Sequence, residues 1–410
     1  MTMKQGALSI AVLMTAMATL PTPAAAQVAD IKIGLIQPLT GAWARSGEMS
    51  QRGAELAVED INKAGGIKAL GGAKLKLVVM DAGDSPEKAK NAAQRLVAQE
   101  PDLAAGIGSN ISSFTLAVTE VTERAGVPWL TLSFSPVVTD RGFKHIFQTS
   151  MTADLQANVA LPTVLKMAQE AAGATPVKVG IVMDNTASPV GFTKNMRVPG
   201  ALDPLGLKLV VDETFTPPLS DAGPVMQKVR AARPDFLFLL PTVVSDIKLT
   251  LEKATEIGLT RAKLQVISSG GPPGSPDLLK IAGKEQLEGM MFITANWPGK
   301  AQEELATRFK KVTGEPWMPQ DSISNYGHVW IIKEAIEQAG SADRAKVSDA
   351  LHSMDLKDGP ADFFPGHHIK FDDKGRRVDA SIVVVQWRNG EPILVYPTDV
   401  AIAKPVWVKN

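Results

Sequence analysis

Residues 103–135 read LAAGIGSNISSFTLAVTEVTERAGVPWLTLSFS and hold the structural unit that recurs along the chain. A short apolar run at 103–107 is followed by a polar turn, an amphipathic stretch at 112–124 and a second apolar run at 128–132. Short buried strands that alternate with helices of 3.6-residue period are typical of a parallel sheet with crossover helices. This stretch therefore predicts an α/β fold.

The same unit recurs on both sides of this stretch. Two strands are expected before it, and a second β/α series of similar size follows the segment at 144–148. Two separate series predict two doubly wound parallel-sheet lobes. The flanking strands are expected at 31–36, 75–80, 177–183, 207–211, 236–240 and 264–267. Helices are expected near 189–202 and, later in the chain, at 302–312, 322–339 and 345–354.

Composition excludes several classes of function. The 410 residues contain 43 basic and 43 acidic side chains, so the net charge is zero and no basic field points to a nucleic-acid partner. The chain has no cysteine, which excludes disulfide bonds, thiolate metal sites, cysteine nucleophiles and lipid attachment to cysteine.

The N-terminus has the pattern of an export signal. Ala7 to Leu20 is an uncharged apolar run that is too short to span a bilayer, and Ala24-Ala25-Ala26 supplies the small side chains of a cleavage site. We expect a signal peptide at 1–26 and a periplasmic product that is not lipid-anchored. The alternative is a buried N-terminal helix.

Catalytic motifs are missing from the sequence. Ile111 stands where a dinucleotide-binding turn needs its third glycine, and no G-x-S-x-G elbow occurs. None of the five histidines is paired at i, i+4 for zinc. We therefore expect no catalytic residue, no metal and no cofactor, while an α/β enzyme with an unrecognised site remains an alternative.

Small polar side chains gather where predicted strands give way to helices. Such turns lie at the ligand-binding edge of open α/β sheets, and an exposed helix start binds anions. For the turn at 108–113 the alternative is ordinary helix capping by Ser109 or Ser112. The candidate ligand residues in three such turns are Trp43 and Arg45, then Ser109, Asn110 and Ser112, and then Ser133, Phe134 and Ser135.

These turns carry a resemblance to a known family. The sequence resembles the periplasmic solute-binding proteins of ATP-driven (ABC) importers, in particular the type I, branched-chain amino-acid-binding group. The similar segments are IKIGLIQPLTGAWARSGEMSQRGAELAVEDINKAGGI at 31–67, VVMDAGDSPEKAKNAAQRLV at 78–97, VPWLTLSFSPVVTDRGFKHIFQTS at 127–150 and LEGMMFITANW at 287–297.

The resemblance implies two lobes joined by three hinge crossovers, near 148–151, 294–298 and 357–366. The N-terminal lobe would comprise 27–148 and 298–358, and the C-terminal lobe 149–297 and 359–410. A small ligand would bind in the cleft of a monomer, and membrane permease subunits would recognise the closed form.

The resemblance also implies roles for single residues. Ser112 matches the serine that binds the ligand carboxylate, with Asn110 contributing through its backbone. On the amine side, Phe134 replaces a threonine, Ala153 replaces an aspartate, and 268–271 lacks the family's acidic residue. Burying an ammonium group without partners costs several kcal/mol. The sequence therefore predicts a carboxylate ligand without an ammonium group.

Aromatic residues complete the predicted site. Trp43, Phe134, Phe192 and Tyr326 would line the cleft, and Arg45 would pair with an acidic group of the ligand; for each of them core packing or solvation is the alternative. These residues predict an aromatic or apolar organic acid as the ligand. A branched-chain amino acid or amide ligand and an extracytoplasmic sensor domain are the other possibilities.

Overall fold

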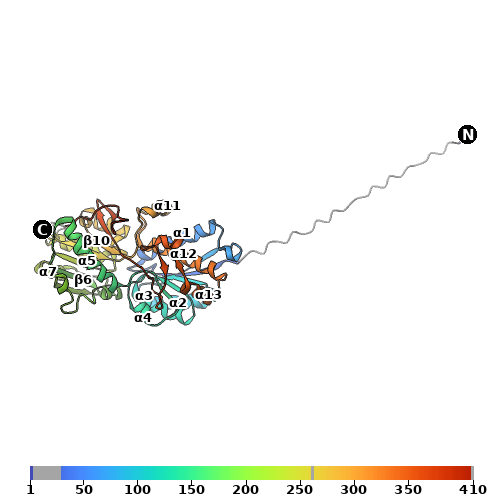
Figure 1. Ribbon diagram of the computed structural model, residues 1–410, viewed down its shortest axis with the longest axis horizontal. Helices are drawn as coiled ribbons and strands as arrows, with labels where there is room; N and C mark the ends of the chain where they lie inside the picture. The colour runs from blue at the N-terminus through green and yellow to red at the C-terminus, as the bar shows by residue number, and fades with distance from the viewer. Residues whose placement is uncertain (3–28, 260–262, 408–410) are drawn as a thin grey trace.

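The computed structural model describes residues 1–2, 29–259 and 263–407. The chain forms two lobes that lie side by side, with the C-terminus at the far end of the second lobe (Figure 1). The predicted signal peptide at 1–26 falls almost entirely outside the described residues.

The N-terminal lobe is built on a five-stranded parallel sheet in the order β2-β1-β3-β4-β5. Apolar side chains of α1, α12 and α13 pack on one face, and those of α2 and α3 pack on the other. The elements are β1 (Ile31–Gln37), α1 (Ala44–Lys63), β2 (Leu75–Asp81), α2 (Pro86–Gln99), β3 (Ala105–Gly108), α3 (Ser112–Arg124), β4 (Trp129–Thr131), α4 (Val137–Asp140), β5 (Ile146–Gln148), α11 (Glu303–Thr313), α12 (Gln320–Ala339) and α13 (Arg344–Ser353).

The C-terminal lobe has a seven-stranded sheet in the order β14-β13-β10-β9-β8-β6-β7. Its first five strands in the chain are parallel, whereas β13 and β14 form an antiparallel hairpin at the edge. The elements are α5 (Ala153–Ala172), β6 (Lys178–Asp184), α6 (Ala187–Thr193), β7 (Lys208–Phe215), α7 (Gly223–Ala232), β8 (Phe236–Leu240), α8 (Val244–Glu256), β9 (Gln265–Ser269), α9 (Pro276–Ala282), α10 (Lys284–Leu287), β10 (Met291–Thr294), β13 (Val383–Arg388) and β14 (Glu391–Tyr396).

Short elements complete the chain. Most are single 3₁₀ turns, and β11 pairs with β12 as a separate two-stranded sheet. These elements are η1 (Lys68–Leu70), η2 (Asp203–Leu205), η3 (Pro272–Gly274), η4 (Lys300–Gln302), β11 (Asp355–Leu356), η5 (Gly359–Phe363) and β12 (Ile369–Lys370).

The chain passes between the lobes after β5, after β10 and before β13. The third passage comes later than the predicted 357–366, because the buried side chains of Phe364, Ile369 and Phe371 join the N-terminal core. The predicted start of the C-terminal lobe at 359 is therefore too early. Beside the first passage, the backbone N–H of Arg377 donates to the carbonyl of Gln148 over 2.9 Å.

Two helices differ from the predicted bounds in ways that affect the cleft. The helix expected near 189–202 is much shorter and ends at Thr193. The helix expected from Ser322 begins two residues earlier, at Gln320, so that Asp321 lies in its first turn.

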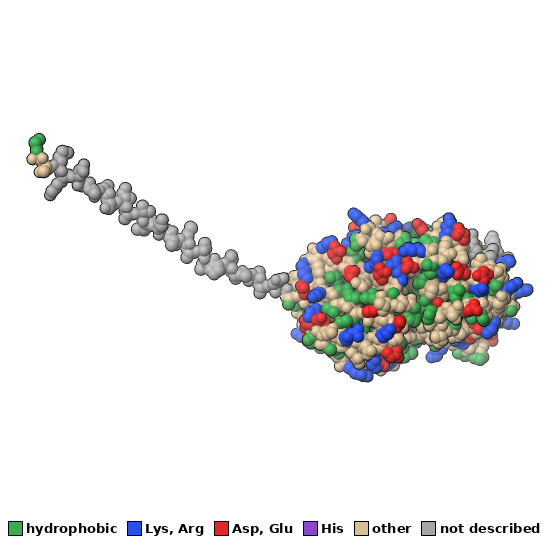
Figure 2. All heavy atoms as spheres, turned by 180° about the vertical axis from the view of Figure 1, so that it is seen from behind, with side chains coloured by type: hydrophobic (Ala, Val, Ile, Leu, Met, Phe, Trp, Pro, Cys, Tyr) green, Lys and Arg blue, Asp and Glu red, His purple; other side chains and the backbone are tan. Residues whose placement is uncertain are grey.

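On the face shown in Figure 2, acidic and basic side chains are interspersed over both lobes, so this face carries no extended field of one sign. Among residues 29–259 and 263–407, no helix is both long enough and apolar enough to cross a membrane.

Helices α1 and α12 approach each other closely at Gly53. A Cβ atom at this position would lie 2.0 Å from the carbonyl oxygen of Ser322, and the Ser322 hydroxyl donates to the carbonyl of Met49 over 2.7 Å. Glycine at 53 therefore permits the contact that holds the start of α12 in place beside α1.

We expect Gly53→Ala to lower the free energy of unfolding by about 1–3 kcal/mol, because the added methyl group forces the two helices apart. In an unobstructed helix the same change would stabilise the protein by about 1 kcal/mol. The sign of the change in urea denaturation therefore tests the contact, and a more stable variant would contradict it.

Candidate functional site

A cavity lies between the lobes, where the carboxyl ends of parallel strands from both sheets meet. Ligands of open α/β sheets bind at this edge. The cavity leaves about 50 Å³ for the centres of water-sized groups. It is lined by Ser46, Asn110, Ile111, Ser112, Leu132, Phe134, Thr186, Ser188, Pro189, Phe192, Leu240, Thr242, Ser269, Gly270, Gly271, Pro272, Gln320 and Asp321.

The turn between β3 and α3 presents an uncapped helix start to the cavity. The N-cap position is Ile111, which makes no side-chain cap, so neither Ser109 nor Ser112 caps the helix. Instead, the Ser112 hydroxyl accepts hydrogen bonds from the backbone N–H groups of Phe134 and Ser135, each over 3.2 Å. The first backbone hydrogen bonds of α3 are donated by Phe114 and Thr115 to the carbonyl of Ile111, over 2.9 and 3.0 Å. The N–H groups of Ser112 and Ser113 precede these bonds, and N–H groups at such a helix start suit an anion.

Three of the predicted serines lie behind the cavity and not in its lining. Ser109 is buried with a φ of 54°, and its hydroxyl donates to the carbonyl of Ile36 over 3.2 Å. The Ser133 hydroxyl donates to the carbonyl of Ser109 over 3.0 Å. Ser135 contacts Ser112 through its backbone. These serines hold the ends of β3 and β4 together and support the turn that lines the cavity.

Apolar side chains form another part of the cavity lining. Phe134 and Phe192 both line the cavity, together with Leu132, Pro189 and Leu240. Phe192 also packs edge-to-face on the ring of Phe238, with 5.5 Å between the ring centroids. Phe192 therefore belongs to the C-terminal core and to the cavity at once, because its ring has one face toward each.

Trp43 does not line the cavity, although the sequence predicts it there. Its ring packs edge-to-face on Phe114 at 5.4 Å. Its indole N–H donates to the hydroxyl of Thr242 over 3.3 Å, and Thr242 lines the cavity from the C-terminal lobe. Trp43 therefore links the two lobes beside the cavity.

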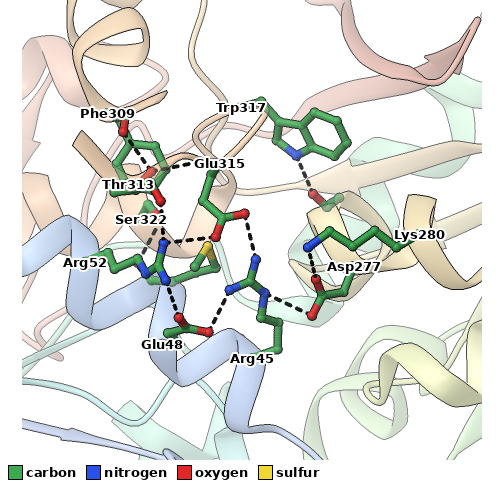
Figure 3. A network of polar contacts seen from close by, with 12 residues as sticks. Arg45, Glu48, Arg52, Asp277, Lys280, Phe309, Thr313, Glu315, Trp317 and Ser322 are labelled. Carbon is green, nitrogen blue, oxygen red and sulfur yellow. Dashed lines mark hydrogen bonds and ion pairs between the residues drawn. The ribbon is translucent and has the colours of Figure 1, made fainter. Parts of the chain in front are cut away.

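Arg45 also lies outside the cavity lining, because carboxylates of the protein occupy its guanidinium group (Figure 3). Its nitrogens lie 2.6 Å from Glu48 and 2.6 Å from Glu315, and Arg52 pairs with the same two carboxylates. The Arg45 Nε lies 3.1 Å from Asp277 of the C-terminal lobe, in an ion pair without hydrogen-bond geometry. The predicted role of Arg45 as a ligand partner is therefore replaced by a role between the lobes.

Tyr326 lies in the N-terminal core and not in the cavity. Its hydroxyl donates to Asp60 over 2.8 Å, and its ring packs edge-to-face on Phe363 at 5.0 Å. Along α12, Tyr326 follows the cavity-lining Asp321 by five residues, which turns its side chain about 140° away around the helix. Helical geometry thus separates it from the cavity.

The sequence prediction missed several cavity residues. From the N-terminal lobe these are Ser46, Gln320 and Asp321, and no motif signals any of them. From the C-terminal lobe come the hydroxyls of Thr186, Ser188 and Thr242, which follow strands, and of Ser269, the last residue of β9. Their place after strands is a signal that sequence alone could have used.

Asp321 is the acidic side chain of the cavity lining. It is 6% exposed, and the Asn110 side-chain amide donates to its Oδ1 over 3.1 Å. Burial raises the pKa of the Asp321 carboxyl to about 6, against hydrogen bonds from Ser46, Asn110 and Gln320 that lower it. Ionisation of Asp321 therefore lowers the stability of the folded protein.

Metal binding finds no support in the described part of the chain. No group of three or more His, Asp or Glu side chains in it could hold a metal ion. The cavity can offer hydroxyls, backbone N–H groups, one carboxylate and aromatic rings to a small molecule.

Comparison with known proteins identifies the family. The family model described as periplasmic binding protein matches residues 30–392. The chain belongs to the periplasmic binding protein family. The resemblance seen in the sequence and the predicted fold class are both confirmed. Members of this family are transport binding proteins, and the family implies a periplasmic or extracytoplasmic location.

Relatives of this periplasmic binding protein include the Leu/Ile/Val-binding protein homolog 7 of Brucella abortus (strain 2308). It is 28% identical over 398 residues, which cover 94% of this chain and 96% of the relative.

Solved structures share the fold. The branched-chain amino acid transporter substrate-binding protein of Streptococcus pneumoniae, in complex with isoleucine, has a TM-score of 0.75 at 20% identity and covers 89% of this chain and 99% of its own. A Rhodopseudomonas palustris solute-binding protein with benzoate has a TM-score of 0.72 at 16% identity, over 93% of this chain and 99% of its own. Another, from R. palustris BisB5 with 3,4-dihydroxybenzoic acid, has a TM-score of 0.71 at 21% identity, over 88% and 95%.

We expect Asp321→Asn to stabilise the ligand-free protein at pH 8 by about 2–3 kcal/mol and to change its stability little at pH 4. The pKa of Asp321 is higher in the folded protein than in the unfolded chain, so the fold is penalised as pH rises from about 4 through 6. Urea denaturation at both pH values measures the difference. An equal effect at pH 4 and pH 8 would contradict it.

We expect Arg45→Ala to lower the free energy of unfolding by about 1–3 kcal/mol, because Glu315, only 8% exposed, loses one of its two cationic partners. Asp277→Asn is the matched change at the other end of the interlobe contact. Since Asp277 is 35% exposed, its loss should cost less than about 1 kcal/mol. Urea denaturation measures both losses of stability. Equal losses for Arg45→Ala and Asp277→Asn would contradict the prediction that Arg45→Ala is the more destabilising change.

Proposed function

We propose that this periplasmic binding protein is the receptor of an ABC importer for a small organic acid with an apolar or aromatic body. The observation that carries the proposal is the composition of the cavity. One wall offers the uncapped start of α3 with Ser112, and a second wall offers the rings of Phe134 and Phe192. A carboxylate suits the first wall, and a flat apolar body suits the second.

Two of the structural neighbours are consistent with such a ligand, since they hold benzoate and 3,4-dihydroxybenzoic acid. The small cavity also favours a compact solute. Delivery would follow closure of the lobes around the solute, with permease subunits of the membrane recognising the closed form. The protein would act as a monomer, exported by its N-terminal signal and free of lipid.

A branched-chain amino acid is the second candidate, and one observation favours it. Asp321 places a carboxylate in the cavity that could accept a hydrogen bond from the ammonium group of an amino acid. The positions that bind this group in the family's amino-acid binders offer it no partner here. The neighbour from S. pneumoniae holds isoleucine. Phe134, at the position where the amino-acid binders carry a threonine, weighs against this candidate.

We expect at least one of benzoate and 3,4-dihydroxybenzoate to raise the melting temperature of the mature protein more than leucine or isoleucine does. A ligand at 100 times its Kd adds about 2.7 kcal/mol to stability. A thermal-shift panel at millimolar concentrations measures this, with glucose as the uncharged control. Strong stabilisation by leucine, with no effect of either aromatic acid, would contradict the organic-acid proposal and support a branched-chain amino acid as the ligand.

A further inference from the structure

A buried carboxylate without a cation faces the ligand cavity. Asp321 is 94% buried in the first turn of α12, and the hydrogen bonds it accepts come from the neutral groups of Ser46, Asn110 and Gln320. Within the described ranges, no lysine, arginine or histidine forms an ion pair with it. A buried ionised group that lacks a charged partner is costly.

The nearest cationic cluster cannot supply that partner. Arg45 and Arg52 of α1 are held by Glu48 and Glu315, and Arg45 also reaches Asp277 (Figure 3). With Lys280, which pairs with Asp277 over 3.1 Å, three cationic and three anionic side chains thus neutralise one another beside the cavity. A molecule bound in the cavity could therefore supply the charged partner that Asp321 lacks.

The carboxylate also contacts the opposite lobe. A Cβ atom on Gly271 would lie 2.9 Å from Asp321 Oδ2, so the glycine backbone of the C-terminal lobe closes directly over the carboxylate. Gly271 and Asp321 both line the cavity. With protein on the side of Asn110 and on the side of Gly271, the cavity is the side from which a further hydrogen-bond donor can reach it.

We propose that Asp321 determines ligand specificity by accepting a hydrogen bond from a hydroxyl or ammonium group that the ligand carries besides its carboxylate. The inference rests on the proposed function and narrows it to acids with such a donor. An acid without a donor leaves the carboxylate of Asp321 with its neutral partners Ser46, Asn110 and Gln320 and is repelled by its charge. An acid with a donor forms a charge-assisted hydrogen bond to Asp321, and this bond offsets the repulsion.

The test compares acids that differ in the donor. Benzoate has no ring donor, 3,4-dihydroxybenzoate has two hydroxyls, and isoleucine has an ammonium group. Calorimetric titration at pH 7.5 uses the mature protein, the D321N variant and the D246N variant. Asp246 is the matched control, because it is 1% exposed, has a pKa raised to about 6 by burial, and lies outside the cavity lining.

The mature protein should bind at least one donor-bearing acid tenfold or more tightly than benzoate. In D321N this preference should fall to threefold or less, through weaker binding of the donor-bearing acid and tighter binding of benzoate. D246N should keep the full preference. Whichever of 3,4-dihydroxybenzoate and isoleucine loses affinity in D321N identifies the donor as hydroxyl or ammonium.

Two results would overturn the inference in different ways. If benzoate and the donor-bearing acids bind the mature protein equally, or if D321N keeps the preference, the role of Asp321 is wrong while the proposed function stands. If none of the acids binds the mature protein, the proposed function fails and the inference fails with it.

Discussion

The structure depends on the direction of its parallel strands. Because strands β1, β3, β4, β6, β8 and β9 run parallel within their sheets, every turn that follows one of them reaches the same edge of its lobe. The two edges meet, and turns from Asn110 to Pro272 along the chain come together around one cavity. A sheet of antiparallel strands would send alternate turns to the far side.

This constraint explains which parts could be predicted from the sequence. The apolar runs and helical periods locate most strands and the long helices, but not the short helices α4, α9 and α10. Strand ends locate Asn110, Ser112 and Phe134. They do not predict Asp321, since it enters the cavity from a helix start that follows no strand of the sheet. Nor do they show that Arg45 meets Glu315, because that contact joins segments 270 residues apart.

The third passage between the lobes shows the same limit. Residues 359–371 follow the last helices of the N-terminal lobe and have no period that assigns them to either sheet. Their assignment comes from three buried side chains, Phe364, Ile369 and Phe371, which complete the N-terminal core. Tertiary packing decides the boundary, and local pattern alone places it too early.

The interlobe contacts of Trp43 and Arg45 have a consequence for the affinity of the cleft. Both contacts hold the lobes together without touching the solute, so they favour the closed conformer before any solute arrives. Apparent affinity depends on the fraction of molecules already competent to bind. Substitutions at Trp43 or Asp277, neither of which lines the cavity, would therefore change uptake at low solute concentration through the resting population of closed molecules, with the lining of the cavity left intact.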